Sequence, residues 1–210
     1  MPTPSLLLAK GTTSKGKAVR PVLLAALMGV VTAFGAGAAS AAECNGVSFP
    51  DQVLADGSSL TLNGLGLRLA TMLKVKVYVA ALYVASPSKD AKTILDSNTR
   101  NQLVLHFVRD VAAGDLNEAW EEGFESNAKE QLPALQERIE RLKTWMADMK
   151  TGQRLTFTSV PGAGIEVDVN GKVEGRIQGD DFSKAFLSIW LGEHPPNPGL
   201  KAGLLGGSCE

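Results

Sequence analysis

The fold of this chain is decided by the stretch Lys76-Val77-Tyr78-Val79-Ala80-Ala81-Leu82-Tyr83-Val84. From Val77 onward it is apolar, β-branched and aromatic, a composition that favours a strand over a helix. Because the apolar residues follow one another without alternation, we expect both faces of this strand to be at least partly covered. Side chains five positions apart in a strand point to opposite faces, so Tyr78 and Tyr83 should lie on different sides of the sheet.

Several shorter segments around this stretch also have strand character. The predicted strands are residues 60–62, 103–108, 154–160, 165–169 and 172–177. Asn170-Gly171 is a strong hairpin signal between the last two strands. Asn63-Gly64 is likewise interpreted as a turn.

Amphipathic segments separate these strands and predict four helices. They cover residues 89–97 after a Ser88 cap, 115–131, Pro133 to about Gly152, and 182–191 after the caps Asp180 and Asp181. The tail from Gly192 is expected to be irregular. Strands grouped apart from helices predict an α+β domain in which an antiparallel sheet carries helices on one face.

The first 42 residues differ in composition from the rest. Four basic residues precede an apolar run from Val22 to about Phe34, and small residues follow. This order is typical of a secretory signal peptide, and the run is shorter than the ~20 residues that a transmembrane anchor needs. We expect a signal peptide at 1–42, cleavage near Ala41 or Ala42, and a periplasmic or otherwise exported domain at 43–210.

Cleavage would leave 168 of the 210 residues, which suits one domain of ordinary size. It removes four of 21 basic residues and none of the 22 acidic ones, so the remaining net charge is about −5. An acidic chain argues against nucleic acid as a partner, because that binding depends on Lys and Arg at phosphates. No other apolar run is long enough to span a membrane, so we expect a water-soluble mature chain without a transmembrane segment.

The two cysteines, Cys44 and Cys209, lie near the ends of the predicted mature chain. An exported protein enters an oxidising compartment, where an even number of cysteines favours pairing. Chain termini often lie close together in a domain. We therefore predict a disulfide between them, with two free thiols as the alternative.

Two blocks of sequence carry a family resemblance. The first is Asn63-Gly64-Leu65-Gly66-Leu67-Arg68, followed by residues 76–84. The second is Gly171-Lys172-Val173-Glu174-Gly175-Arg176-Ile177-Gln178-Gly179-Asp180-Asp181-Phe182, leading into Ile189-Trp190-Leu191-Gly192. In order and spacing they resemble the bacterial, exported branch of the chalcone isomerase-like family, over about residues 46–205.

The resemblance implies an open-faced β-sandwich, in which a large antiparallel sheet carries a helical layer on one face and a ligand cleft lies between them. Plant chalcone isomerases add a phenolate oxygen to an enone within one molecule, without a cofactor. An Arg before the signature strand, a hydroxyl residue on it, a Tyr–Asn pair and a Thr on the last helix form their site. Other relatives resemble fatty-acid binders, in which the same Arg and a Tyr hold a carboxylate.

Only part of that site has a counterpart in this chain. Arg68 matches the family Arg, and Tyr78 stands where isomerases have Thr and fatty-acid binders have Tyr. The segment Ala112–Glu118 lacks the isomerase Tyr, the following Asn falls near Gly123, and the Thr falls at about Trp190. The resemblance therefore implies the ligand-binding residues Arg68 and Tyr78, with Arg68 as the one catalytic candidate if the protein is an isomerase.

The chemistry of this pair suits an anion. A guanidinium offers a fork of N–H donors that matches a carboxylate, and a phenol adds one more donor. The alternative is that Arg68 pairs with a nearby acid and Tyr78 simply packs. His106 lies mid-strand and is interpreted as a hydrogen-bonded core residue, and no spacing of Cys, His and Asp resembles a metal site.

Three functions remain open from the sequence. The first is a non-catalytic, cofactor-free binder of a small acidic or aromatic ligand such as a fatty acid. The second is an isomerase, or intramolecular lyase, that acts on a phenolic enone, since a single Arg can stabilise an oxyanion. The third is an envelope accessory protein without a dedicated ligand.

Overall fold

The computed structural model describes residues 41–209, which fall in one compact unit. The predicted signal peptide therefore lies outside the described residues except for its last two positions, Ala41 and Ala42. Those two residues begin the first strand, β1 (Ala41–Cys44). No helix in residues 41–209 is long and apolar enough to cross a membrane.

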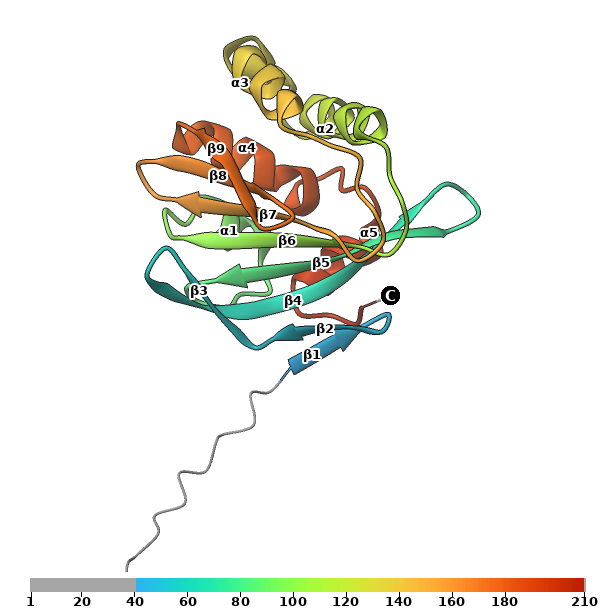
Figure 1. Cartoon of the computed structure of the whole chain (residues 1–210). Coiled ribbons are helices and arrows are strands. Elements are labelled where there is room, and N and C mark those ends of the chain that lie inside the picture. Colours follow the sequence, from blue (N-terminus) through green and yellow to red (C-terminus); the bar gives the residue numbers. More distant parts are fainter. Residues whose placement is uncertain (1–40, 210) are drawn as a thin grey trace, which may run out of the picture. The chain divides into compact units, whose positions relative to one another are not determined.

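The domain is built on one seven-stranded antiparallel sheet whose strands lie in chain order (Figure 1). The strands are β3 (Gln52–Ala55), β4 (Ser58–Ala70), β5 (Val75–Val84), β6 (Asn101–Phe107), β7 (Arg154–Val160), β8 (Gly164–Val169) and β9 (Lys172–Ile177). Each strand pairs with the next along the chain. The α+β class and the antiparallel sheet predicted from the sequence are confirmed.

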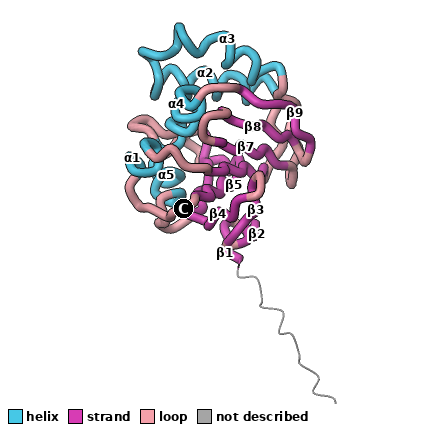
Figure 2. Tube along the Cα trace, turned by 90° about the vertical axis from the view of Figure 1, so that its left-hand side faces the viewer, coloured by secondary structure: helices cyan, strands magenta, loops and turns pink. Residues whose placement is uncertain are grey.

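The helices gather on one side of this sheet (Figure 2). They are α1 (Ala91–Asp96), α2 (Ala113–Ala128), α3 (Leu132–Thr144), α4 (Asp180–Leu191) and α5 (Pro198–Leu204), with a short 3₁₀ turn, η1 (Lys129–Gln131), between α2 and α3. Their apolar faces form one core with every second residue of β5, from Tyr78 to Val84. The helical layer expected of an open-faced sandwich is present.

The opposite face of the sheet carries a second, smaller core. The hairpin of β1 and β2 (Val47–Pro50) packs there against Val79, Ala81 and Tyr83 of β5. Cys44 of β1 and Cys209 are joined in a disulfide, with their Cα atoms 5.8 Å apart. Strand β5 is therefore covered on both faces, as its unbroken apolar run indicates.

The prediction of a turn at Asn63-Gly64 was wrong, because β4 continues through both residues with a register shift between Leu62 and Gly64. The side-chain amide of Asn63 donates to the carbonyl oxygens of Ser88 at 3.0 Å and of Leu204 at 2.7 Å. A Cβ atom on Gly64 would lie 2.1 Å from the carbonyl oxygen of Gly203. The Asn-Gly pair thus allows α5 to pack against bare strand backbone.

The same packing explains why the tail is not irregular. Helix α5 begins with Pro198 in its first turn, where a missing N–H costs nothing. Leu200 and Leu204 are fully buried in the helix-side core. The tail was predicted to be irregular because it contains Pro195, Pro196 and Pro198, and the seven residues of α5 are too few to show a periodic pattern.

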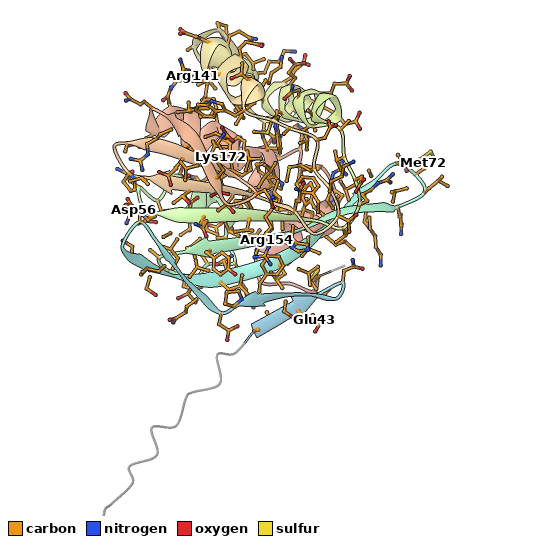
Figure 3. All side chains as sticks on the ribbon, viewed as in Figure 1. Glu43, Asp56, Met72, Arg141, Arg154 and Lys172 are labelled. Atoms are coloured by element: carbon orange, nitrogen blue, oxygen red, sulfur yellow. A yellow bond between two sulfur atoms is a disulfide. The ribbon has the colours of Figure 1, made fainter. Side chains whose placement is uncertain are left out.

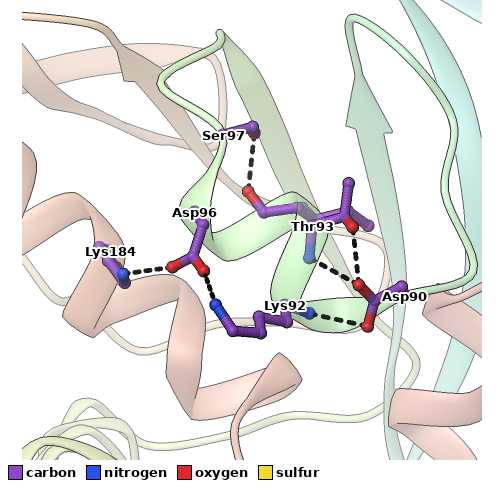
Figure 4. Close-up of polar contacts among 7 residues, drawn as sticks. Asp90, Lys92, Thr93, Asp96, Ser97 and Lys184 are labelled. Carbon is purple, nitrogen blue, oxygen red and sulfur yellow. Dashed lines mark hydrogen bonds and ion pairs between the residues drawn. The ribbon is translucent and has the colours of Figure 1, made fainter.

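Two predicted helix caps were also wrong. Helix α1 is capped by Asp90 rather than Ser88, and the Asp90 carboxylate accepts hydrogen bonds from the backbone N–H groups of Lys92 and Thr93 (Figure 4). Asp180 and Asp181 lie inside the first turn of α4, after Gly179 with φ 106°. Their carboxylates bind the N–H of Gly162 and the guanidinium of Arg138 instead.

Candidate functional site

A cavity of about 560 Å³ lies between the sheet and the helices. Its walls come from β4, β5, α2, α4, the segment 109–111 and the residues that follow α4. Small-molecule sites in proteins have volumes of roughly 300–1,000 Å³ and are mostly apolar with a few placed polar groups. The volume of this cavity falls in that range, and its walls combine apolar residues such as Trp120, Ile189 and Trp190 with several charged ones. It lies where the resemblance places the ligand cleft.

Arg68 and Tyr78 both line this cavity. They are direct cross-strand partners in the β4–β5 pairing. Directly opposed residues of an antiparallel pair have Cβ atoms about 5 Å apart and point to the same face. The sheet therefore holds the guanidinium and the phenol side by side.

Arg68 is half-buried and has no acidic partner. None of the ion pairs in residues 41–209 involves it. Its Nη1 donates to the carbonyl oxygens of Leu69 at 2.5 Å and Pro196 at 3.0 Å, whereas Nε and Nη2 make no hydrogen bond within the described chain. The backbone contacts fix the guanidinium, and its charge is not neutralised by a carboxylate. The alternative in which Arg68 pairs with a nearby acid does not describe this structure.

Tyr78 is buried and hydrogen-bonded through its oxygen. The indole Nε1 of Trp190 donates to the Tyr78 hydroxyl at 3.0 Å. Burial raises the pKa of Tyr78 to about 12, although the hydrogen bond from Trp190 and the charge of Arg68 both lower it. Tyr78 is therefore a neutral phenol at physiological pH, and because its oxygen accepts from Trp190, its own proton remains available to an acceptor.

An aromatic wall stands behind this polar pair. Trp120 of α2 and Trp190 of α4 both line the cavity, and their ring centroids are 5.7 Å apart. The Nε1 of Trp120 is buried and has no hydrogen-bond partner within residues 41–209. A buried N–H group without a hydrogen-bond partner lowers the stability of a protein by about 1–3 kcal/mol. A ligand oxygen that accepted a hydrogen bond from Nε1 of Trp120 would remove this cost.

A short segment after α4, here called the strap (Glu193–Asn197), closes one side of the cavity through His194, Pro195 and Pro196. The side chain of Asn127 in α2 holds one end, since it accepts from the N–H and donates to the carbonyl of His194. At the other end the Asn197 side chain bonds the backbone of Leu67 and Leu69 in β4. The sequence did not indicate the strap, because its Pro-rich composition predicts only irregular chain.

The acidic residues of the cavity lie at its outer rim. Asp115 and Glu122 of α2 are exposed. Asp110 is already bound by Lys150 at 3.1 Å and by the backbone N–H of Thr151 at 3.0 Å. Arg109, also exposed, lines the same rim without an ion pair in the described residues. The unpaired positive charge of the inner wall is thus that of Arg68.

The positions where plant isomerases carry their remaining catalytic groups also reach this cavity. Trp190, at the place of the Thr, is fully buried and occupies its space with an indole. Gly123 and the segment around Asp115 line the cavity without a hydroxyl group. The structure thus brings Arg68 and Tyr78 together and has no counterpart of the Tyr, Asn and Thr of the isomerase site.

Comparison with known families agrees with this geometry. Residues 41–206 match the family model described as chalcone isomerase-like. The chain belongs to the chalcone isomerase-like family. No curated protein sequence matches it.

Among solved structures, the fold is similar to the crystal structure of a fatty-acid binding protein from Arabidopsis thaliana. The TM-score is 0.64 at 16% sequence identity, and the match covers 79% of this chain and 96% of the plant chain. At 16% identity, this similarity shows that the two proteins share a fold and shows nothing about the ligand of this chain. The ligand has to be argued from the residues of its own cavity.

Proposed function

We propose that this protein binds a small carboxylic acid with an apolar body, such as a fatty acid, and does not convert it chemically. The observation that carries the proposal is the unpaired guanidinium of Arg68 beside the neutral phenol of Tyr78, in a cavity whose walls include Trp120, Ile189 and Trp190. Two free nitrogens of Arg68 and the hydroxyl proton of Tyr78 match the oxygens of one carboxylate. The apolar walls would stabilise an acyl chain by about 0.8 kcal/mol per buried CH₂.

The similarity to a plant fatty-acid binding protein supports this choice of ligand class, since that protein shares the fold. The aromatic wall supports it further, because Trp120 and Trp190 add apolar surface next to the anion-holding pair. Binding of the acid would also give the guanidinium of Arg68 the negatively charged partner that it lacks within residues 41–209.

Native mass spectrometry of the protein purified from cells tests the proposal directly. We expect a bound carboxylic acid of defined mass that is released on denaturation. The Arg68→Ala variant should lose most of this occupancy, whereas Arg141→Ala, an exposed arginine of α3 labelled in Figure 3, should retain it. A wild-type protein without any bound acid, which also fails to take up added fatty acid, would favour the accessory-protein alternative.

The isomerase alternative is separated by a second assay. A chalcone incubated with the protein should keep its absorbance, because the cavity has no counterpart of the Tyr, Asn and Thr that accompany the Arg in plant isomerases. Loss of absorbance that depends on Arg68 would show that the protein is an isomerase.

We also propose that the chain is exported and that residues 43–210 form the mature domain. The basic and apolar order of residues 1–42 supports this. An intact mass of the periplasmic protein that begins at Ala42 or Glu43 is expected. An uncleaved protein in the cytoplasm would contradict it.

A further inference from the structure

The turn that joins β4 to β5 exposes two large apolar side chains. This hairpin tip, Thr71–Lys74, carries Met72, which is 100% exposed, and Leu73, which is 86% exposed. Figure 1 shows the β4–β5 hairpin extending beyond the rest of the sheet, and Figure 3 places Met72 at its end. Neither side chain belongs to the two apolar cores of the domain.

The backbone of the hairpin tip is held in an uncommon conformation. Thr71 has φ 63° and Lys74 has φ 53°, a region that residues other than glycine rarely adopt and β-branched residues least of all. The turn is closed by a hydrogen bond from the Lys74 N–H to the Thr71 carbonyl at 3.1 Å. The tip is thus a defined turn that directs Met72 and Leu73 outward.

The charge around the tip is opposite to that of the domain. No Asp or Glu occurs between Asp56 and Asp90, although the predicted mature chain has a net charge of about −5. Lys74 and Lys76 are exposed and take part in none of the ion pairs found among residues 41–209. An acidic protein with one basic projection would meet an anionic surface with that projection first.

The tip is also continuous with the candidate ligand site. Arg68 and Ala70 on β4 and Val77 on β5 line the cavity, and the tip lies directly between these strands. Whatever surface the tip touches therefore lies next to the ligand site. Two side chains are far too little for a specific protein interface, which buries about 1,200–2,000 Å². They suffice for partial insertion into lipid, which needs apolar area and charge attraction but no shape complementarity.

We propose that the hairpin tip docks this protein on an anionic lipid bilayer, with Met72 and Leu73 inserted among the lipids and Lys74 and Lys76 at the headgroups. This docking places the cavity beside the bilayer, where apolar acids partition. The inference goes beyond the acid-binding function and does not depend on it, since the tip would bind vesicles with an empty cavity.

Vesicle flotation tests the docking. The intact mass of the purified protein first shows at which residue its chain begins. The protein is then mixed with vesicles of phosphatidylglycerol and phosphatidylcholine, or with vesicles of phosphatidylcholine alone. Wild type should bind the anionic vesicles preferentially and lose binding as salt is added. The double variant Met72→Ser/Leu73→Ser should bind at least about tenfold more weakly, and Lys74→Glu/Lys76→Glu should lose the preference for anionic lipid.

Leu54→Ser is the matched control, because Leu54 on β3 is 76% exposed and lies outside the hairpin tip. It should bind vesicles like the wild type. No binding of wild type to anionic vesicles, or equal binding by the Met72→Ser/Leu73→Ser variant, would overturn the proposal. So would a concentration-dependent dimer in vesicle-free solution that this variant abolishes, because the tip would then be a contact between two copies.

Acid binding in vesicle-free solution separates this proposal from the proposed function. The tip variants should bind a soluble fatty acid with wild-type affinity and take it up more slowly from vesicles. Loss of acid binding in Arg68→Ala with unchanged flotation would leave both proposals standing. Flotation without any acid binding by the wild type would contradict only the ligand.

Discussion

The two faces of strand β5 use the same residue type in different ways. On one face Tyr83 is buried under the β1–β2 hairpin, and its hydroxyl donates to the carbonyl oxygen of Pro50 at 3.0 Å. On the other face Tyr78 accepts from Trp190 at 3.0 Å and borders the cavity. The hydroxyl proton of Tyr83 is used within the fold, whereas that of Tyr78 is available. Both tyrosines are buried, so burial does not distinguish them, and it is the free hydroxyl proton that makes Tyr78 the proposed ligand-binding residue.

The arginines of the two faces differ in the same way. Arg154, on the side of the β1–β2 hairpin, lies over the ring of Phe49 at 5.7 Å and donates to Nδ1 of His106 at 3.0 Å. Arg68 is fixed by backbone carbonyls and keeps two nitrogens without partners. We call the side of the sheet covered by the β1–β2 hairpin the closed face, and the side that borders the cavity the cavity face. Residues of the closed face are therefore expected to govern stability, and residues of the cavity face are expected to govern ligand binding.

The largest effect should come from the disulfide on the closed face. Cys44 and Cys209 close a loop with a sequence separation of 165 residues, and the chain-entropy model assigns such a cross-link about 4–5 kcal/mol. Denaturant unfolding of the Cys44→Ser/Cys209→Ser variant should show a loss of this order. Fatty-acid affinity under native conditions should stay unchanged. A variant as stable as the wild type would contradict the role given to the closed face.

Tyr83→Ala should cost about 3–5 kcal/mol of unfolding free energy, because it removes a fully buried ring. Tyr83→Phe keeps the ring and loses only the bond to Pro50, so about 1 kcal/mol is expected. Urea denaturation measures both. If either variant weakened acid binding as much as a change at Arg68, the assignment of the two faces would be wrong.

Both tyrosines should resist ionisation in the folded protein. Burial raises the pKa of Tyr78 and of Tyr83 from 10.0 to about 12. Because the folded values are raised, the stability that these phenols contribute is fully present below pH 10 and is lost as the pH rises through about 12. Tyrosinate absorbance should therefore rise near pH 12 in buffer and near pH 10 in denaturant. A native titration near pH 10 would show that these rings are accessible to water.

The smallest effect should be that of Tyr78→Phe on affinity. It removes one neutral donor, so the dissociation constant for a fatty acid should rise about 2- to 10-fold. Tyr83→Phe is the control and should not change it. If both variants weakened binding equally, the effect of Tyr78→Phe would come from a loss of stability and not from a lost contact with the ligand.

Much of the fold could be predicted from local sequence. The unbroken apolar run of β5 gave a strand covered on both faces, and Asn170-Gly171 forms the expected hairpin turn with φ 54° and 87°. The hairpin of β1 and β2 was missed because its four-residue strands are too short to show a period. The turn predicted at Asn63-Gly64 was wrong because a dipeptide that often forms turns also permits close contact between a strand and a helix. That contact involves Leu204, 141 positions further along the chain, so the local sequence does not show it.

The candidate site could likewise be predicted only in part from the sequence. Arg68 and Tyr78 could be placed together from the family resemblance, and the β4–β5 register makes them neighbours. Trp190 was identified only as a departure from the isomerase pattern. Its bond to Tyr78 depends on where α4 packs, 112 residues along the chain. The hairpin tip showed no local signal, because exposure of Met72 is a property of the folded hairpin.

Calorimetric titration of a soluble fatty acid into wild type, Arg68→Ala and Arg141→Ala tests the central claim most directly. Each charge-assisted hydrogen bond contributes about 1.5–3 kcal/mol, so Arg68→Ala should bind about 10- to 150-fold more weakly. Arg141→Ala should bind like the wild type. An Arg68→Ala protein that is folded and keeps its affinity would contradict the account.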